Sequence, residues 1–481
     1  MKTPTKTNLI FLSIALLVYG ILTLVCWNNG YFWDNIQLTS IEAHWYYLTD
    51  FKTMLVPKHA PEYGLSGTGA PPLLPLITAL LWKCIGYKLW VSHAFVALWA
   101  IILIYNTHHF LKHFFSNQYA GWVLLIVLGE AALLTQYAIA SPDFILFTSL
   151  VICLRAIFEK KSLLLAFGIL FLLNISTRGF FTGAILLFVH LIFYFIRKQK
   201  FASRSFVKTF LPYVPTWVLM IAYIVYYIVM QGWFFDNSNF SEAQNSPESL
   251  SFVIKHLCDF GMRFIENGQL AIWLVAFFAG WKTYKAKKHL SPDLYFLLVF
   301  FLLLTGLYLS FVFLTKMPFL TRYFIPHIFL LTILSISKLT EFIPERKTNY
   351  ILVFILCFEL TGHLWIYPEK VTTIWDSTLA HLPFYGLRKD CFDYIDRNNY
   401  DYRDISAGFC LYDNRRFVEL GNINKTIGRD KNRKYFIYSN LSNVPDDWID
   451  EFHDKTHWIP IRSFEKGFVV ITIYKNLNYK N

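Results

Sequence analysis

The chain has 481 residues, of which 55% are hydrophobic and only 16% charged, and its mean hydropathy is +0.41. A soluble globular domain carries about 25% charged residues, so this composition excludes an ordinary water-soluble protein. The net charge of +12 does not indicate nucleic-acid binding, because Lys and Arg lie in short clusters between apolar runs, where membrane topology determinants occur. The cysteines form no CxxC pair, so they give no support to a metal or redox site.

Apolar segments of near-spanning length follow one another along the first three quarters of the chain. The first follows a basic N-terminus but ends without a small-residue cleavage site, so we interpret it as an uncleaved span rather than a signal peptide. We therefore predict an α-helical polytopic membrane protein with about eleven transmembrane helices. They cover residues 8–28, 89–111, 119–140, 144–159, 162–176, 180–196, 206–230, 268–281, 293–314, 321–338 and 349–367.

One further apolar segment, PPLLPLITALLWKCIGY at 71–87, is short and rich in proline. If it crossed the membrane, every later loop would change sides, and the basic runs RKQKFASR and KTYKAKKH would face outward. If it does not cross and the N-terminus is inside, the cytoplasmic loops carry about twice as many basic residues as the external loops. We therefore predict a juxtamembrane or re-entrant segment within an external loop at 29–88.

The composition becomes polar after about residue 367, which predicts a membrane domain at 1–367 and a small soluble α/β domain at 368–481. Alternating runs at 435–439 and 468–474 predict strands, and the run at 446–454 predicts a short helix. Eleven crossings from an inside N-terminus place this domain outside the cytoplasm. There, Cys391 and Cys410 can pair as a disulfide or remain as two free thiols.

Two acidic residues lie at predicted external ends of spans. Asp34 follows the first span within YFWDN, and Asp143 lies between two apolar runs in SPDFILF. Each carboxylate alone can simply mark the water boundary, because a charge inside a span costs roughly 2.5–3.5 kcal/mol. Both, however, are predicted on the same membrane face.

Basic residues are also predicted on that face, where they are normally depleted. Arg178 interrupts a long apolar stretch in STRGFFTGA, and Lys316 and Arg322 lie on either side of the start of the tenth span. Arg178 can be a snorkelling side chain at a tight turn. Alternatively it is an anion ligand, because Arg matches phosphate geometry bidentately and Gly179 would leave room for a headgroup. The convergence of acids and bases on one face favours a functional site.

The order of these motifs over residues 8–340 resembles the GT-C glycosyltransferases, which include protein O-mannosyltransferases and lipid A aminoarabinose transferases. Two positions depart from the family pattern: Asn35 stands where a second acid is common, and Ala70 stands where Lys or His commonly precedes the double proline. The matching elements are Asp34, the segment GAPPLLPLITALLWKCIG at 69–86, the acid of Ser141-Pro142-Asp143, the turn Thr177-Arg178-Gly179 and the run RYFIP at 322–326.

The resemblance implies a glycosyltransferase that takes a sugar from a polyprenyl-phosphate donor, such as an undecaprenyl-phosphate sugar. Asp34 would be the base, and Asp143 would orient acceptor or sugar or hold a cationic neighbour. The remaining site residues would bind donor or acceptor: Arg178, Lys316 and Arg322 at the donor phosphate, Tyr323 as a further substrate contact, and Lys52, Lys58 or His59 in place of the contact missing at Ala70.

The sequence also leads to expectations about a metal cofactor, the binding partners and the location of the protein. Two carboxylates can hold a divalent cation, but hard cations prefer more oxygen ligands than the sequence assigns, so we predict no obligatory metal. The expected partners are the lipid-linked donor, membrane lipid and a glycan, glycolipid or protein acceptor, at the inner or plasma membrane with an extracytoplasmic site. A lipid or sugar transporter or flippase without transferase activity is the alternative, and a scaffold whose external domain binds another protein is a third hypothesis.

Overall fold

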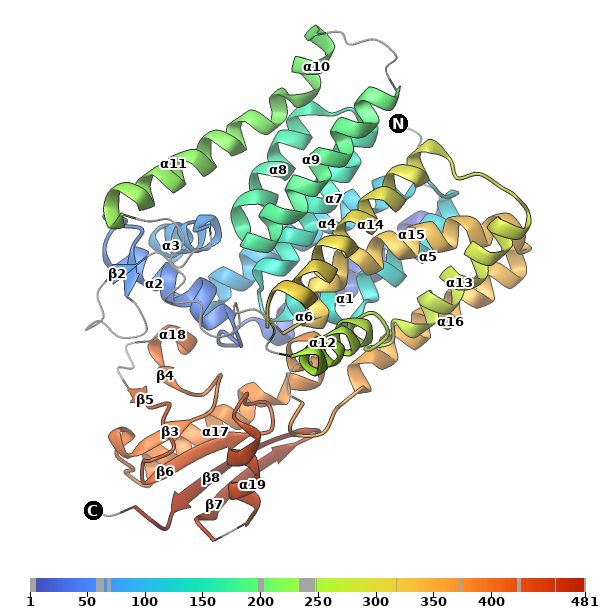
Figure 1. Ribbon diagram of the computed structural model, residues 1–481. Helices are drawn as coiled ribbons and strands as arrows, with labels where there is room; N and C mark the ends of the chain where they lie inside the picture. Colours follow the sequence, from blue (N-terminus) through green and yellow to red (C-terminus); the bar gives the residue numbers. More distant parts are fainter. Residues whose placement is uncertain are drawn as a thin grey trace.

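The computed structural model describes residues 6–57, 65–66, 71–197, 203–232, 247, 249–316, 318–371, 374–421, 425–454 and 456–479. It is a bundle of helices with a small mixed domain at one end, formed by the last part of the chain (Figure 1). The sequence thus correctly predicts a mostly helical architecture with a small C-terminal sheet.

All eleven predicted spans contain helical residues. The helices of the bundle are α1 (Lys6–Cys26), α2 (Glu42–Leu48), α3 (Leu73–Ile85), α4 (Leu89–Leu111), α5 (Asn117–Gly129), α6 (Ala131–Ala138), α7 (Pro142–Glu159), α8 (Ser162–Ile175), α9 (Thr177–Arg197), α10 (Ser203–Phe210), α11 (Val214–Gln231), α12 (Leu250–Arg263), α13 (Leu270–Lys285), α14 (Pro292–Leu314), α15 (Ile325–Phe342) and α16 (Glu345–Leu360). Of these, α2, α3 and α12 are helices that lie outside the predicted spans.

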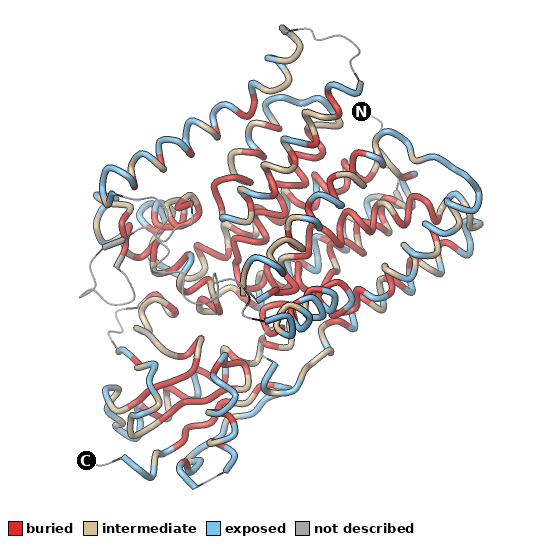
Figure 2. The backbone as a smooth tube through the Cα atoms, in the orientation of Figure 1, coloured by how far each residue is buried: buried red, intermediate tan, exposed pale blue. Residues whose placement is uncertain are grey.

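Six helical segments within the described chain are long and apolar enough to cross a membrane, and the pair α5–α6 would be a seventh. The inward faces of the helices form the buried interior of the bundle, whereas many apolar side chains on its outer helices are exposed (Figure 2). An apolar exterior is what a lipid environment requires. The count of eleven crossings stays a prediction.

The segment 119–140 differs from the single span that we predicted. It consists of α5 and α6, which meet at an angle of 60°. The break is at Glu130, whose side chain caps α6 by accepting a hydrogen bond from the Leu133 backbone N–H at 2.6 Å. A capping carboxylate satisfies N–H groups that a continuous helix would have paired, so a new helix begins there in a new direction.

The proline-rich segment at 71–87 folds as α3, with 13 residues. At 1.5 Å per residue such a helix is about 20 Å long. That is shorter than the roughly 30 Å hydrocarbon core of a bilayer, so α3 alone is too short to span it. Its juxtamembrane or re-entrant placement stays a prediction.

The C-terminal domain has a four-stranded sheet in the order β3-β6-β8-β7, in which only β3 and β6 are parallel. The predicted strands at 435–439 and 468–474 and the predicted helix at 446–454 are confirmed as β6, β8 and α19. The elements are β3 (Ile405–Ala407), β4 (Asp413–Asn414), β5 (Thr426–Ile427), β6 (Tyr435–Ser439), β7 (Trp458–Lys466), β8 (Val469–Asn476), α17 (Pro383–Arg397), α18 (Arg416–Glu419) and α19 (Asp446–Asp454), besides the short pair β1 (Val56–Pro57) and β2 (Leu65–Ser66) in the first loop.

This domain is not independent of the bundle. Its hydrophobic core includes Phe32 and Trp33 from the loop after α1, and the Phe32 ring stacks on His381 at a centroid distance of 4.7 Å. Cys391 and Cys410 lie in the same core as free cysteines. Because one core joins the loop to the domain, the position of the residue after Trp33, Asp34, depends on the C-terminal domain.

The end of the bundle that lies away from the C-terminal domain contains the loops that carry many of the basic residues. Lys288 Nζ lies 3.4 Å from Glu341 Oε2, and His113 Nε2 lies 2.7 Å from Asp293 Oδ2. These contacts join the loop before α14 to the end of α15, and the first turn of α14 to the turn after α4.

This grouping of basic loops makes the orientation of the protein testable. A topology reporter fused after Lys288 should be cytoplasmic, because basic loops are retained inside. A reporter fused to the C-terminus should be external. Protease protection of both fusions in intact cells measures this, and a cytoplasmic C-terminus would contradict the predicted topology.

Candidate active site

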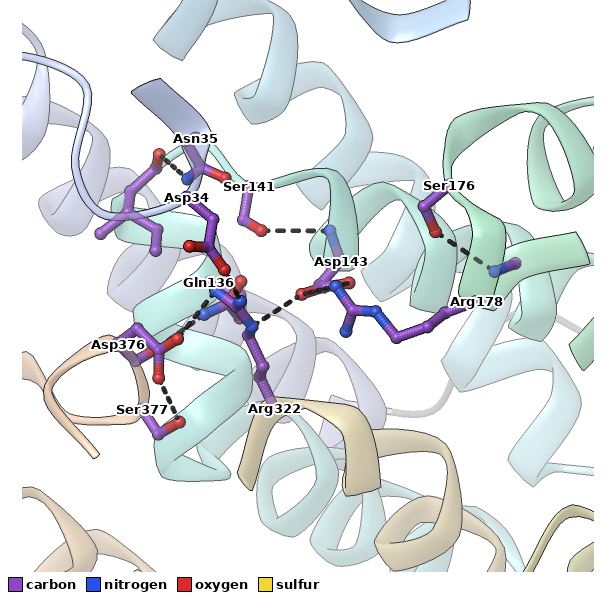
Figure 3. A network of polar contacts seen from close by, with 12 residues as sticks. Asp34, Asn35, Gln136, Ser141, Asp143, Ser176, Arg178, Arg322, Asp376 and Ser377 are labelled. Carbon is purple, nitrogen blue, oxygen red and sulfur yellow. Dashed lines mark hydrogen bonds and ion pairs between the residues drawn. The ribbon is translucent and has the colours of Figure 1, made fainter. Parts of the chain in front are cut away.

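Charged side chains from five separate segments converge between the bundle and the C-terminal domain (Figure 3). Asp34 follows α1, Asp143 is in the first turn of α7, and Arg178 is in the first turn of α9. Arg322 lies in the 3-10 turn before α15, and Asp376 lies in the 3-10 turn that leads into the C-terminal domain. Four of these five residues are candidates from the sequence.

Arg322 is at the centre of the cluster. Its Nη1 lies 2.7 Å from Asp376 Oδ2 and its Nε lies 3.3 Å from Asp143 Oδ2, while its Nη2 donates to Asp34 Oδ2. The Arg322 side chain is only 2% exposed. A buried charge is tolerated only when it is paired, so the guanidinium and the three carboxylates require one another.

Arg178 is the second arginine of the cluster. Its Nη2 lies 2.8 Å from Asp143 Oδ1 and 3.0 Å from Asp143 Oδ2, and its guanidinium carbon lies 4.0 Å from the centre of the Tyr323 ring. The ring and the carboxylate fix the arginine through a cation–π contact and an ion pair. The Arg178 side chain is nevertheless 24% exposed, so it remains accessible to a ligand.

Helix starts place Asp143 and Arg178 at this end of the bundle. Ser141 caps α7, since its Oγ accepts a hydrogen bond from the Asp143 N–H at 3.1 Å, and Pro142 occupies the first helical position. Both residue types favour a helix start, and a carboxylate is favourable in the first turn. Ser176 does the same at α9, where its Oγ accepts from the Gly179 N–H at 3.2 Å.

Gly179 has a packing role that differs from the one expected. A Cβ atom at this position would lie 2.0 Å from the Leu172 carbonyl oxygen. The absent side chain therefore lets the start of α9 approach the backbone of α8, and this space is occupied by protein rather than left for a ligand headgroup.

The turn that carries Arg322 is anchored by Glu266, which is buried just after α12. Both Glu266 carboxylate oxygens accept from Arg263 Nη1, at 2.7 and 2.8 Å. The Thr321 hydroxyl donates to Oε1, and the Tyr367 hydroxyl donates to Oε2 at 3.2 Å. One carboxylate thus ties the residue before Arg322 to α12 and to the segment leading to the C-terminal domain.

Asp34 is the most exposed carboxylate of the cluster, with a side chain that is 35% exposed, against 5% for Asp143 and 0% for Asp376. Its backbone carbonyl accepts from the Leu38 N–H at 2.8 Å, and the next residue, Asn35, donates through Nδ2 to the Ile139 carbonyl at 3.0 Å. Asp34 is therefore the carboxylate of this cluster best placed to meet a substrate.

Asp376 was not identified from the sequence. Its Oδ1 accepts from the Ser377 hydroxyl at 3.1 Å, and its backbone carbonyl accepts from Gln136 Nε2 at 2.6 Å. Burial raises the pKa of Asp376 to about 6, although the Arg322 charge opposes this shift. The available signal was a lone acid within the apolar run IWDSTLAHLPF.

The other predicted site residues are more scattered. Lys316 is partly buried in the loop between α14 and the turn of Arg322, and the Tyr323 ring supports Arg178. Lys52 is exposed in the first loop, beside Asp50 rather than in the cluster. Lys58 and His59 lie outside the described residues. Roles in substrate binding stay predictions for this group, as does the absence of an obligatory metal.

No protein-family description and no curated protein matches the sequence. The structure is similar to apo ArnT from Cupriavidus metallidurans, with a TM-score of 0.55, 13% identity and 97% of both chains covered. It is also similar to the ArnT structure from the same organism bound to undecaprenyl phosphate, with a TM-score of 0.50, 11% identity and 97% of both chains covered. The chain therefore has the same overall fold as these ArnT structures, as the order of its sequence motifs predicts.

Proposed function

We propose that the protein is a glycosyltransferase that moves a sugar from a polyprenyl-phosphate donor to an acceptor on the extracytoplasmic side of the membrane. The observation that carries the proposal is that one cluster contains both an accessible carboxylate, Asp34, which is paired with Arg322, and an accessible arginine, Arg178, which is paired with Asp143. Transfer from a phosphate leaving group needs a proton acceptor and a cation in one site. The ArnT fold, seen in one structure with undecaprenyl phosphate, supports the choice of donor.

The lipid part of the donor is proposed to lie along an apolar groove between α9 and α14. Arg178 is at the start of α9, and Ala184 in the groove wall is six residues, or about 9 Å, further along the helix. A phosphate at Arg178 would thus place the attached chain at the groove entrance. The groove is lined by Ala184, Ile185, Phe188, Leu302, Leu303, Gly306 and Leu307.

In the proposed reaction, an acceptor hydroxyl oxygen bonds to the anomeric carbon of the sugar on the face opposite the phosphate. The bond from that carbon to the phosphate oxygen breaks, and the polyprenyl phosphate leaves with the electron pair. Asp34 takes the proton from the acceptor hydroxyl. Arg178 donates to the departing phosphate, whose charge increases as the bond breaks.

The buried members of the cluster are proposed to position these two groups. Asp143 bridges Arg178 and Arg322, which matches the suggested role of holding a cationic neighbour. Arg322 orients Asp34, while Asp376 balances the charge of Arg322. A direct Arg322–phosphate contact, which the sequence resemblance implies, would require a rearrangement of these ion pairs. Lys316, with Lys52, Lys58 or His59, is proposed as a further contact to phosphate or acceptor.

Replacing Arg178 with alanine should weaken binding of undecaprenyl phosphate by roughly 1.5–3 kcal/mol, because a charge-assisted hydrogen bond is lost. Arg178→Lys should restore only part of the affinity, since Lys lacks the planar fork of donors. Titration of the purified protein with undecaprenyl phosphate measures both. Arg346→Ala, at an exposed arginine in the first turn of α16, is the control and should bind normally. Equal affinity in all variants would refute the phosphate assignment.

The transporter alternative predicts a different fate for the donor. A transferase breaks the bond between sugar and phosphate, whereas a transporter or flippase moves the intact lipid-linked sugar. Chromatography of the lipids recovered from proteoliposomes that contain an undecaprenyl-phosphate sugar and an acceptor fraction distinguishes the two. Release of undecaprenyl phosphate together with glycosylated acceptor supports transfer, and an unchanged donor found on the other leaflet supports transport.

A further inference from the structure

Two glutamates inside the bundle face the same small cavity, apart from the cluster around Arg322. Glu130 lies at the break between α5 and α6, and Glu359 lies in the last turn of α16; both side chains are buried. Thr332 of α15, whose hydroxyl donates to the Ile328 carbonyl at 2.7 Å, lines the same cavity, which has room for a particle of about the size of a water molecule. The other lining residues are Ile126, Val127, Phe147, Ile325, Ile328 and Phe329.

The polar groups of this cavity are incompletely paired. Glu130 accepts from Leu133 N at 2.6 Å and from Gln269 Nε2 at 3.0 Å. In contrast, neither carboxylate oxygen of Glu359 has a hydrogen-bond partner within the described chain, and the fully buried Gln269 amide oxygen has none either. A buried acceptor without a donor is costly, so these oxygens would be stabilised by a proton, a hydrogen-bond donor or a bound cation.

The backbone adds further negative character. No cap hydrogen bond continues α5 past Gly129 in the described chain, and the next helix turns away by 60°. The last carbonyl groups of a helix lack helical partners and form the negative end of its dipole. Ile126 and Val127, from this last turn, are in the cavity wall. The two carboxylates and the last turn of α5 thus border the same cavity.

We propose that this cavity binds one monovalent metal cation, of which Na⁺ is the best fit. The ligands would be carboxylate oxygens of Glu359 and Glu130, the Thr332 hydroxyl oxygen and a carbonyl from the last turn of α5, all from residues that line the cavity. Oxygen donors suit hard cations, and broken helices inside membrane bundles bind Na⁺ at their C-terminal ends. The small cavity disfavours a divalent cation, which takes six or more oxygens or keeps its waters.

Such an ion would stabilise the site without contacting substrate. Gln136 at the end of α6 holds the Asp376 carbonyl, and Asn267, two residues before Gln269, donates to the Ser377 carbonyl at 3.4 Å. An ion held by Glu130 and Glu359 would fix the α5–α6 bend against α16, and Glu130 also holds Gln269. Because Gln136 and Asn267 contact the turn that carries Asp376, that turn would be fixed as well. This role does not depend on which group the enzyme transfers.

The test is the thermal unfolding temperature of the purified full-length protein, measured by Trp fluorescence in NaCl and in choline chloride at equal ionic strength and fixed pH. Wild type should show a saturable rise with Na⁺. Glu359→Gln should lose this rise, whereas the control Glu345→Gln, at an exposed position on the same helix, should keep it. An unfolding temperature that is equal in both salts, with Glu359→Gln at least as stable as wild type, would show that Glu359 is simply protonated and would overturn the proposal.

Direct binding of radioactive Na⁺ decides the matter even if Glu359→Gln fails to fold. Thr332→Val keeps the size of the side chain and its packing but removes the hydroxyl ligand. Wild type should bind about one Na⁺ saturably, with weaker binding by Thr332→Val. The absence of saturable binding to wild type, or unchanged binding by Thr332→Val and the folded Glu359 variant, would contradict the site.

Discussion

Replacing Asp34 with asparagine should abolish sugar transfer while leaving expression, membrane insertion and donor binding largely intact. Asparagine keeps the shape of the side chain and can still accept a hydrogen bond from Arg322, but it cannot take a proton. General-base assistance contributes about 10²–10⁴ in rate, so turnover should fall by that factor. The 35% exposed side chain makes an indirect effect through lost packing small. Turnover with a defined undecaprenyl-phosphate sugar, measured beside donor affinity, gives the answer.

Two comparisons make this result specific to Asp34. Asp50→Asn, at an exposed acid of the same loop that pairs with Lys83, should leave turnover unchanged. Asp143→Asn should impair turnover more mildly, because it weakens the support of Arg178 and Arg322 and removes no group that touches the acceptor. Near-normal turnover by a folded Asp34→Asn variant would rule out the base assignment.

Replacing Arg322 with glutamine should have the largest effect on stability of any single change in the cluster. It leaves Asp376 fully buried and unpaired, while Asp143 retains Arg178. Removing one partner of a buried ion pair typically costs about 3–5 kcal/mol. We therefore expect a large fall in the unfolding temperature of the purified protein, and little folded protein at the growth temperature.

A second substitution separates charge from packing in this result. Asp376→Asn in the Arg322→Gln background removes the unpaired carboxylate, so the double variant should be more stable than Arg322→Gln alone. A double-mutant cycle on the unfolding free energies measures the coupling between the two residues. A double variant no more stable than the single one would show that the pair does not hold the cluster together.

The sequence alone predicted that four of the five clustered charges lie on one face of the membrane. Asp34, Asp143, Arg178 and Arg322 are far apart in the chain, but each lies at the end of an apolar run, and counting runs put all four on one face. In the structure they touch one another. The two confirmed strands and the helix of the C-terminal domain were also readable, because alternation and amphipathic spacing are local properties.

What the sequence could not indicate is how these charges pair. A motif does not reveal whether an arginine faces a ligand or three carboxylates, and Arg322 was assigned only to phosphate. Asp376 and Glu266 were missed because their importance comes from long-range contacts, with Arg322 and Thr321 respectively. The bend at Glu130 was missed since a single acid in an apolar run does not disclose that it caps a new helix.

The most direct test of the proposed function follows a sugar label from lipid to acceptor. Purified wild-type protein and Asp34→Asn, in nanodiscs, receive an undecaprenyl-phosphate sugar labelled in the sugar, together with an acceptor fraction from cell envelopes. Wild type should transfer the label and release an equal amount of undecaprenyl phosphate, whereas Asp34→Asn should bind the donor and leave it intact. Label that stays on the lipid with wild type across a panel of donor sugars, or transfer at the wild-type rate by Asp34→Asn, would contradict the proposed function.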